Sequence, residues 1–251
     1  MSNVCISTNN LTIGYEHTVV QRDLSFSLQK GEMVCMLGKN GCGKSTLLRT
    51  LAGLQPVLGG EFSFPISDIR YPISDNPSNI ALVLTERLSL ENTTVHDVVA
   101  MGRYPYTSFL GGLSAEDEHI IAQALEDVGL SDTLYPISDT PFNAHSDGEK
   151  QRALIAKAIA QQTPIILLDE PTAHLDLPNR IKILQLLRRL AHEQGKMILI
   201  STHELDLAIQ LSDRILLMSD EGIQLDTPAN LRACKAFTKA FGMDIFNPLN
   251  F

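Results

Sequence analysis

Short runs of hydrophobic residues, each four or five positions long, recur along the chain between more polar stretches. A nearly continuous apolar run of this length is typical of a strand covered on both faces, as the strands of a parallel sheet are. The runs that predict such strands are 33–37, 80–84, 165–168, 197–200 and 215–218. The sequence therefore predicts an α/β fold around a mainly parallel sheet.

A different pattern comes before the first of these runs. Residues 24–28 alternate between apolar and polar side chains, as a strand with one exposed face does. Together with strands expected at 4–8 and 11–15, they predict a small antiparallel β layer at the N-terminus.

The stretch between the second and third apolar runs has no comparable strand pattern. An acidic helix start at 114–117 is followed by apolar residues at helical spacing, and Gly129 provides a stop. Val95, Val98 and Val99 indicate another, shorter helix. We therefore expect one domain over residues 1–251, with a helical subdomain inserted at about 90–160.

Charge and composition exclude several classes of protein. The formal net charge of −9 opposes a broad nucleic-acid-binding face, so no nucleic-acid partner is expected. It has no apolar run long enough for a transmembrane segment and no signal-peptide pattern at the start. The 4 cysteines are scattered without metal-site spacing, which favours a reducing compartment. We expect the protein to stay in the cytosol.

The strongest motif is the segment from Gly38 to Ser45, which matches the phosphate-binding pattern Gly-x-x-x-x-Gly-Lys-Ser/Thr. It follows a predicted strand and precedes a predicted helix at 46–51, as the pattern requires. Glycines let backbone N–H groups converge on a phosphate, and the helix start adds more. Lys44 would sit between the terminal phosphates and the Ser45 hydroxyl would ligate magnesium. The candidate nucleotide-binding residues here are Gly38, Lys39, Asn40, Gly41, Cys42, Gly43, Lys44, Ser45 and Thr46.

Polar residues also follow two other predicted core strands, and ligands of open parallel sheets bind beyond the carboxyl ends of strands. Asp169 could hold the magnesium ion, and Glu170 could take a proton from an attacking water. His203 follows the strand at 197–200, where a neutral imidazole could bridge the terminal phosphate and that water. A lone histidine is usually structural, but its place at the edge that carries Glu170 favours a functional role.

These motifs, in this order, resemble the nucleotide-binding domain of ABC transporters, from Tyr15 to about Asp226. The resemblance implies a P-loop NTPase that binds ATP and Mg²⁺. Tyr15 matches the aromatic residue that stacks on adenine, with an interior tyrosine as the alternative. His174 and Asp176 match the loop that contacts the opposite subunit.

The family signature is usually Leu-Ser-Gly-Gly-Gln, and the matching stretch here is His-Ser-Asp-Gly-Glu at 145–149. The resemblance implies a signature that acts in trans through Ser146, Gly148 and Glu149, closing over the phosphate held by a second copy. The same stretch also predicts a capped helix start, which is an anion site in any case. Asp147 replaces a glycine and adds a negative charge that would weaken closure.

A second departure from the family follows the strand at 80–84. The family has there a glutamine that contacts magnesium and water, and the aligned residue is Thr85, followed by Glu86. A threonine hydroxyl can still ligate a hard cation, but its reach is shorter. In the family this glutamine also relays the state of the site to the membrane subunits, so we expect the departure to change the geometry of that coupling.

The stretch 94–106 is similar to the ATPases of iron-complex, haem and cobalamin importers. That resemblance implies paired ATPase subunits at the cytoplasmic face of the inner membrane, integral-membrane permease subunits and, indirectly, a substrate-binding protein. Tyr104, Pro105 and Tyr106 would line the groove for a permease helix, or merely pack the subdomain. Two alternatives are a soluble ABC ATPase and a degenerate nucleotide-binding regulator, the latter suggested by Thr85 and Asp147.

Overall fold

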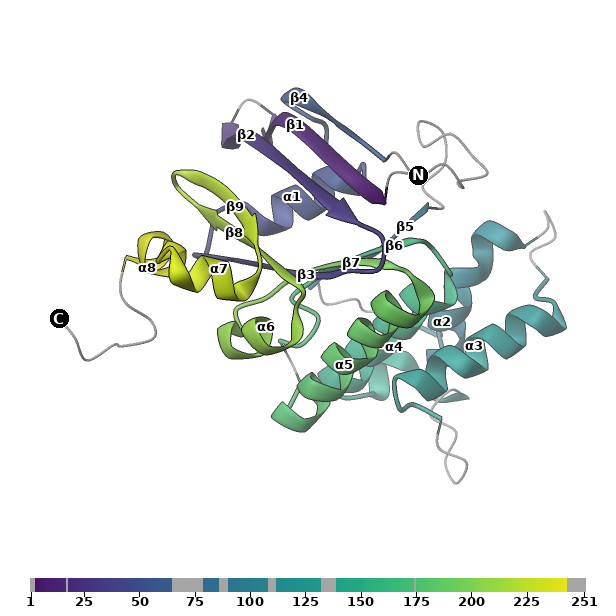
Figure 1. The fold of residues 1–251 in the computed structure, drawn as a ribbon. Coiled ribbons are helices and arrows are strands. Elements are labelled where there is room, and N and C mark those ends of the chain that lie inside the picture. Colours follow the sequence, from purple (N-terminus) through teal and green to yellow (C-terminus); the bar gives the residue numbers. More distant parts are fainter. Residues whose placement is uncertain are drawn as a thin grey trace.

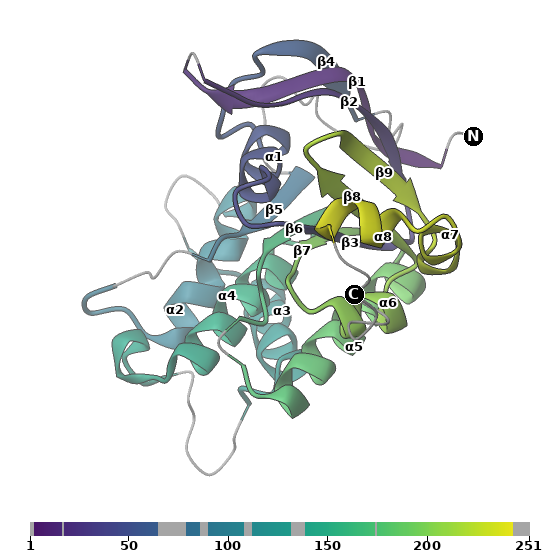
Figure 2. The same cartoon turned by 90° about the vertical axis from the view of Figure 1, so that its left-hand side faces the viewer.

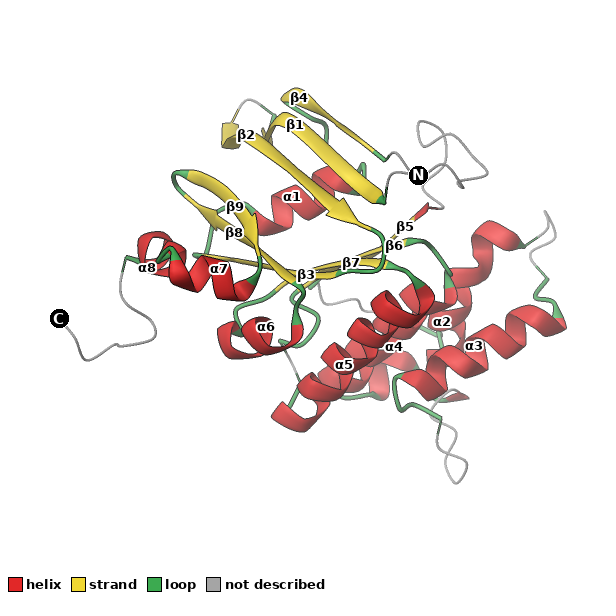
Figure 3. Ribbon diagram, viewed as in Figure 1, coloured by secondary structure: helices red, strands yellow, loops and turns green. Residues whose placement is uncertain are grey.

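The computed structural model describes residues 3–16, 18–64, 79–85, 90–107, 112–131, 139–173 and 175–242. Two sheets lie one above the other in Figure 1, and most of the helices lie below the larger sheet. Figure 3 shows the same division, with yellow strands in the upper half and red helices mainly in the lower half.

The larger sheet contains the strands that the apolar runs predict, which confirms the mainly parallel core. Its order is β5 (Ile80–Val83), β6 (Ile165–Asp169), β7 (Met197–Ser201), β3 (Met33–Gly38), β8 (Arg214–Ser219) and β9 (Gly222–Asp226). Strands β5 to β8 run parallel, whereas β9 pairs antiparallel with β8. The carboxyl ends of β6, β7 and β3 therefore lie side by side, with β7 in the middle.

The smaller sheet confirms the antiparallel N-terminal layer. Its order is β2 (Thr18–Gln29), β1 (Val4–Tyr15) and β4 (Gly59–Ser63). The two strands expected at 4–8 and 11–15 are one strand, β1, whose pairing with β2 shifts between Thr8 and Leu11. Asn10 takes a positive φ of 47° at this irregularity, which explains why the alternation breaks there.

Between β5 and β6 the described chain forms helices, in agreement with the expected inserted helical subdomain. They are α2 (Val95–Ala100), the 3-10 helix η3 (Met101–Tyr106), α3 (Ala115–Asp127), the 3-10 helix η5 (Phe142–Ala144) and α4 (Asp147–Ala160). Helices α2, α3 and α4 each begin with a capping box, at Thr94, Ser114 and Ser146. The reciprocal hydrogen bonds of a capping box fix where each helix starts.

Arg103 holds this helical segment together from within. The residue is 5% exposed, and its guanidinium donates from Nε to Asp117 Oδ1 at 2.8 Å and from Nη1 to the carbonyl of Ala160 at 2.8 Å. It also lies 4.1 Å from the centre of the Tyr106 ring. Hydrogen bonds from Ser114, and then from Arg103, lower the pKa of Asp117 to about 2, so this carboxylate stays charged near neutral pH.

The remaining helices cover the larger sheet and its end. They are α1 (Lys44–Leu51), α5 (Leu177–Gln194), α6 (Leu205–Leu211), α7 (Pro228–Ala233) and α8 (Ala236–Phe241). Helix α1 lies between the two sheets, as the side view in Figure 2 shows, whereas α5 and α6 lie on the opposite face of the larger sheet. No helix in the described ranges combines the length and apolar character needed to cross a membrane.

Alternate residues of each central strand enter two separate cores. In β3, Val34 and Met36 pack with α1 and the smaller sheet, whereas Cys35 and Leu37 pack with the helices on the other face. Covering both faces accounts for the unbroken apolar runs in the sequence. It also holds the strand ends rigidly, and the polar loops that carry the site follow directly from them.

Candidate active site

The predicted phosphate-binding loop connects β3 to α1. Gly41 and Gly43 have φ angles of 79° and 103°, a region that side chains with a Cβ rarely adopt. A Cβ on Gly38 would lie 2.6 Å from the carbonyl oxygen of Met218, so close packing also excludes a side chain there. The glycines of the motif are therefore required by the shape of the loop.

Lys44 lies folded into this loop. Its side chain is buried, and Nζ donates to the carbonyls of Gly38 at 2.9 Å and Lys39 at 3.1 Å. The ammonium group thus occupies the concave side of the loop, where the sequence places the terminal phosphates. Burial raises the pKa of the neighbouring Cys42 thiol, which keeps that sulfur protonated and unreactive.

Tyr15, at the end of β1, lies beside the start of α1. The Thr46 hydroxyl donates to Tyr15 Oη at 3.0 Å, and the tyrosine is 50% exposed. The alternative of an interior tyrosine is therefore wrong. An exposed ring next to the phosphate loop can present its face to a planar base.

Asp169 is the last residue of β6 and Glu170 follows it, and a serine of the neighbouring strand contacts both. The fully buried hydroxyl of Ser201, at the end of β7, donates to Asp169 Oδ1 at 2.5 Å. The same hydroxyl accepts from the Glu170 N–H at 3.0 Å. Ser201 was not predicted from the sequence, because its only signal is a polar residue at the end of an apolar run.

Glu170 and His203 meet across the ends of β6 and β7. His203 Nε2 lies 2.6 Å from Glu170 Oε1, and both side chains are partly exposed. Glu170 has a positive φ of 46°, which is rare for a residue with a side chain and is concentrated at functional sites. A small cavity of about 90 Å³ connects His203 with Gly38 of the phosphate loop.

Thr85 follows β5, next to β6 in the sheet. Its hydroxyl donates to the backbone carbonyl of Asp169 at 3.0 Å. That contact places the threonine oxygen next to the acidic strand end and leaves its lone pairs available to a cation. Glu86, the next residue in the sequence, lies outside the described residues.

The signature stretch forms the N-terminus of α4. Ser146 and Glu149 make the capping box, with Ser146 Oγ donating to Glu149 Oε2 at 2.7 Å. The Ser146 hydroxyl is the main cause of a lowered pKa for Glu149, which therefore stays ionised. His145 Nδ1 lies 3.5 Å from the same carboxylate. Glu149 is thus committed to local contacts.

A hollow of about 310 Å³ opens over this helix start. Its lining includes Ser146, Gly148 and Glu149 together with Asp176, the N-cap of α5, whose Oδ1 accepts from the Asn179 N–H at 3.1 Å. The lining contains none of the phosphate-loop residues. One copy therefore presents the loop and the signature as separate surfaces. His174 lies outside the described residues.

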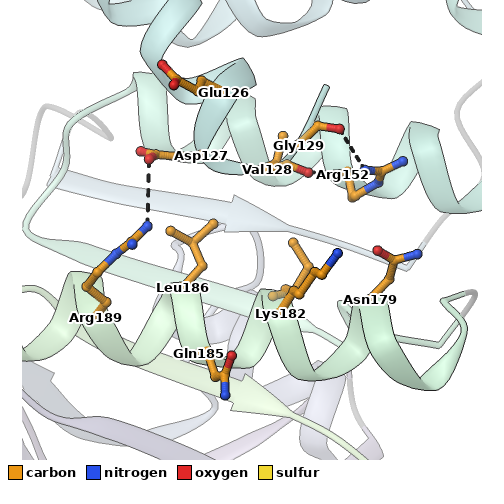
Figure 4. A pocket seen from close by; sticks show the side chains of 11 residues that line it. Glu126, Asp127, Val128, Gly129, Arg152, Asn179, Lys182, Gln185, Leu186 and Arg189 are labelled. Atoms are coloured by element: carbon orange, nitrogen blue, oxygen red, sulfur yellow. Dashed lines mark hydrogen bonds and ion pairs between the residues drawn. The ribbon is translucent and has the colours of Figure 1, made fainter. Parts of the chain in front are cut away.

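A larger cavity, of about 450 Å³, lies away from these residues. Figure 4 shows it between the end of α3 and helix α5, with Arg189 reaching Asp127 across it at 3.7 Å. Arg152 closes one end by donating to the carbonyl of Gly129 at 2.9 Å. The cavity separates the helical segment from α5 and shares only Arg152 and Asn179 with the hollow at the signature.

The fold and the strand-end residues define a P-loop nucleoside triphosphatase. The sequence also matches a model of the ABC transporter family over residues 21–173. It is 39% identical over 208 residues to the Iron(3+)-hydroxamate import ATP-binding protein FhuC of Bacillus subtilis, covering 82% of this chain and 76% of the relative. It is 31% identical over 235 residues to the Ferric enterobactin transport ATP-binding protein FepC of Escherichia coli K12, covering 93% and 85%.

Solved structures agree with these relatives. A metal-chelate type ABC transporter in an inward-facing conformation superposes with a TM-score of 0.80 at 30% identity, covering 96% of this chain and 90% of that one. A dimeric ATP-binding cassette in a post-hydrolysis state with ADP and Pi gives a TM-score of 0.75 at 26% identity, covering 89% and 98%.

The chain therefore belongs to the ABC transporter family. It is an ATP-binding and ATP-hydrolysing subunit of such a transporter. Cassettes of this class dimerise and partner with membrane permeases. The alternatives of a soluble ABC ATPase and of a degenerate regulator find no support in these relatives.

Proposed function

We propose that this chain powers import of an iron chelate of the siderophore kind, with haem or a cobalamin as alternative cargo of the same importer class. The names of the relatives support iron-hydroxamate and ferric enterobactin as the type of substrate. The observation that carries the catalytic assignment is the pairing of Glu170 with His203 at 2.6 Å, beside the phosphate loop.

For nucleotide binding, we assign the adenine to the exposed face of Tyr15 and the phosphates to the loop from Gly38 to Thr46. Lys44 would exchange its two backbone carbonyl partners for phosphate oxygens. The start of α1 contributes unpaired N–H groups and the positive end of its dipole.

For hydrolysis, Glu170 accepts the proton of the attacking water, since its carboxylate lies at a strand end beside the loop. His203 orients that carboxylate by donating its Nε2–H across the 2.6 Å contact. A neutral imidazole has only this one N–H, so His203 would reach the terminal phosphate by turning the N–H from Glu170 to a phosphate oxygen when ATP binds. Ser201 keeps the Glu170 backbone in its unusual conformation.

The oxygen donors near the loop fit a magnesium ion. Ser45, Thr85 and Asp169 would hold it, because hydroxyl and carboxylate oxygens are the ligands of this hard cation. When bound, the ion neutralises negative charge on the phosphates. Ser201 occupies one oxygen of Asp169, so the other oxygen is left for the ion.

The second half of each site comes from a second copy of the chain. Ser146 and Gly148 would cap the triphosphate held by the partner's loop, while Glu149 would hold the helix start that carries them. Asp176 would lie at the same interface with His174. The support is the separation of the signature hollow from the phosphate loop within one copy. Asp147 adds a carboxylate at this helix start, so closure is expected to be weaker than with glycine.

The permease would dock on the helical segment, at the cytoplasmic face of the membrane, with a substrate-binding protein delivering the chelate from the other side. Tyr104 and Tyr106 are 58% and 48% exposed, unusual for aromatic residues. Arg103, buried against the Tyr106 ring, fixes the turn that carries both tyrosines.

The catalytic assignment is tested by Glu170→Gln, which removes the base and keeps the shape of the side chain. We expect ATP binding to be retained, hydrolysis to fall by at least about a hundredfold, and an ATP-bound dimer to accumulate. Phosphate release and size-exclusion chromatography with ATP measure these changes. Glu193→Gln, an exposed carboxylate on α5, is the matched control. Turnover of Glu170→Gln near the unmutated rate would refute the base.

A further inference from the structure

Gln21, in β2, carries a buried amide that points at the phosphate loop. The residue is 9% exposed, and its Nε2 donates to the carbonyl of Cys42 at 3.2 Å and to the carbonyl of Ser219 at 3.0 Å. Burying an amide is costly unless its hydrogen bonds are made, and here both donors of the group are used. Neither the loop motif nor the paired acids requires a glutamine at this position.

The contact with Cys42 fixes the direction of one peptide unit. In a planar trans peptide, the carbonyl and the N–H of the next residue point to opposite sides. Because the Cys42 carbonyl points toward Gln21, the Gly43 N–H points away from β2. The loop is concave on that other side, where the Lys44 ammonium lies.

Close packing at Gly43 holds the same peptide from behind. A Cβ built on Gly43 would lie 2.8 Å from Val20 Cγ1 and 3.4 Å from Gln21 Cγ. The loop backbone therefore rests directly on β2, and the φ of 103° at Gly43 excludes most other residues.

The second hydrogen bond anchors Gln21 to the larger sheet. Ser219 is the last residue of β8, and Met218 beside it pairs in register with Gly38 at the start of the loop. The amide thus connects the smaller sheet, the end of β8 and the phosphate loop. Because the bond to Ser219 already fixes the Gln21 amide, the side chain loses little further freedom when it also holds the Cys42 carbonyl.

We propose that Gln21 is a positioning residue for nucleotide binding: it fixes the Cys42–Gly43 peptide so that the Gly43 N–H faces the triphosphate. This inference rests on the proposed phosphate site. Without the amide, the peptide can rotate and direct a carbonyl oxygen at the phosphates, where it repels them.

The test replaces Gln21 with methionine, which has a similar length and volume but no donor. We expect the Kd for ATP to rise by about five- to tenfold, the effect of losing one net hydrogen bond in the cradle. Isothermal titration calorimetry on the purified chain measures the Kd, and thermal melting without nucleotide measures stability.

A matched control separates positioning from general stability. Thr8→Val removes a buried hydroxyl from the same sheet, where Thr8 accepts from the Phe26 N–H at 3.0 Å, distant in sequence from the loop. We expect Thr8→Val to lower the melting temperature and leave the Kd for ATP within about twofold of the unmutated value. An unchanged Kd in Gln21→Met overturns the proposal. An equal rise in Thr8→Val also overturns it.

Lys44→Ala distinguishes failure of this inference from failure of the phosphate site itself. Unchanged ATP affinity in Lys44→Ala would remove the site and the inference together. Weakened affinity in Lys44→Ala, combined with normal affinity in Gln21→Met, would leave the phosphate site in place and reject the role of Gln21 alone.

Discussion

A single buried hydroxyl, that of Ser201, connects the two acidic residues at the end of β6. It donates to the Asp169 carboxylate and accepts from the Glu170 backbone, so it bears on metal ligation and on the position of the base together. Alanine at this position would leave Asp169 free to rotate and the Glu170 N–H with one acceptor fewer. Hydrogen bonds to charged groups are stronger than those between neutral groups, so the variant loses a strong bond to the Asp169 carboxylate. We expect this loss to slow hydrolysis more than it weakens ATP binding.

We therefore expect Ser201→Ala to lower the kcat of ATP hydrolysis by roughly ten- to a hundredfold while the Kd for ATP changes little. Steady-state phosphate release and nucleotide titration measure the two quantities. Ser212→Ala removes another buried hydroxyl, one that donates to the Ala208 carbonyl at 2.5 Å, and serves as the control. Equal kcat losses in the two variants would argue against a specific role for Ser201.

Residues with a motif around them could be proposed from the sequence, whereas those that act through a neighbouring strand could not. Lys44, Asp169 and Glu170 follow apolar runs in a recognisable order. Ser201 and Gln21 act on residues 32 and 21 positions away, and only the pairing of strands brings them close. No local pattern encodes such a contact.

At the scale of elements, one buried ion pair and one exposed ion pair hold the helical segment in different ways. Arg103 and Asp117 have side-chain exposures of 6% and 9%, whereas Arg189 is 53% exposed in its 3.7 Å contact with Asp127. Removing one partner of a buried pair leaves a charge without compensation, but water compensates an exposed one.

Arg103→Met should accordingly lower Tm by roughly 5–10 °C. Arg189→Met, by the same reasoning, should shift it by less than roughly 2 °C. Differential scanning calorimetry on the two variants provides the comparison. The prediction is that Arg103→Met lowers Tm more than Arg189→Met does, and similar Tm shifts in the two variants would contradict it.

Two strands with weak patterns escaped prediction. Strand β4 has the sequence Gly-Gly-Glu-Phe-Ser and a mostly exposed surface, so it lacks the alternation that identifies a strand. Strand β9 contains partly buried residues throughout and pairs at the edge of the sheet. The central strands, in contrast, are buried on both faces and were visible as apolar runs.

At the scale of the whole molecule, cassettes of this class dimerise and partner with membrane permeases. The exposed Tyr104 is the best single probe of the permease contact. Tyr104→Glu should abolish copurification with the permease while basal ATP hydrolysis stays within about twofold, because an interface core excludes unpaired charge. Detergent extraction followed by affinity purification measures the association.

Leu54→Glu introduces the same charge at another exposed apolar side chain, which is 64% exposed beyond α1, and is the matched control. Permease association that survives Tyr104→Glu, or that is lost equally in Leu54→Glu, would place the docking surface elsewhere. The sequence could suggest Tyr104 and Tyr106 as permease contacts only by resemblance, because their exposure depends on how Arg103 holds the turn.

The position of the Lys44 ammonium has one more consequence. Through its hydrogen bonds to the carbonyls of Gly38 and Lys39, the Lys44 side chain ties the first residues of the loop to the start of α1 and keeps the loop curved. When a nucleotide binds, the Lys44 ammonium would exchange these two carbonyl oxygens for phosphate oxygens, and the loop backbone would need little further ordering. A phosphate loop that is already ordered loses little conformational entropy when a nucleotide binds. We expect this preorganisation to favour rapid exchange of ADP for ATP between transport cycles.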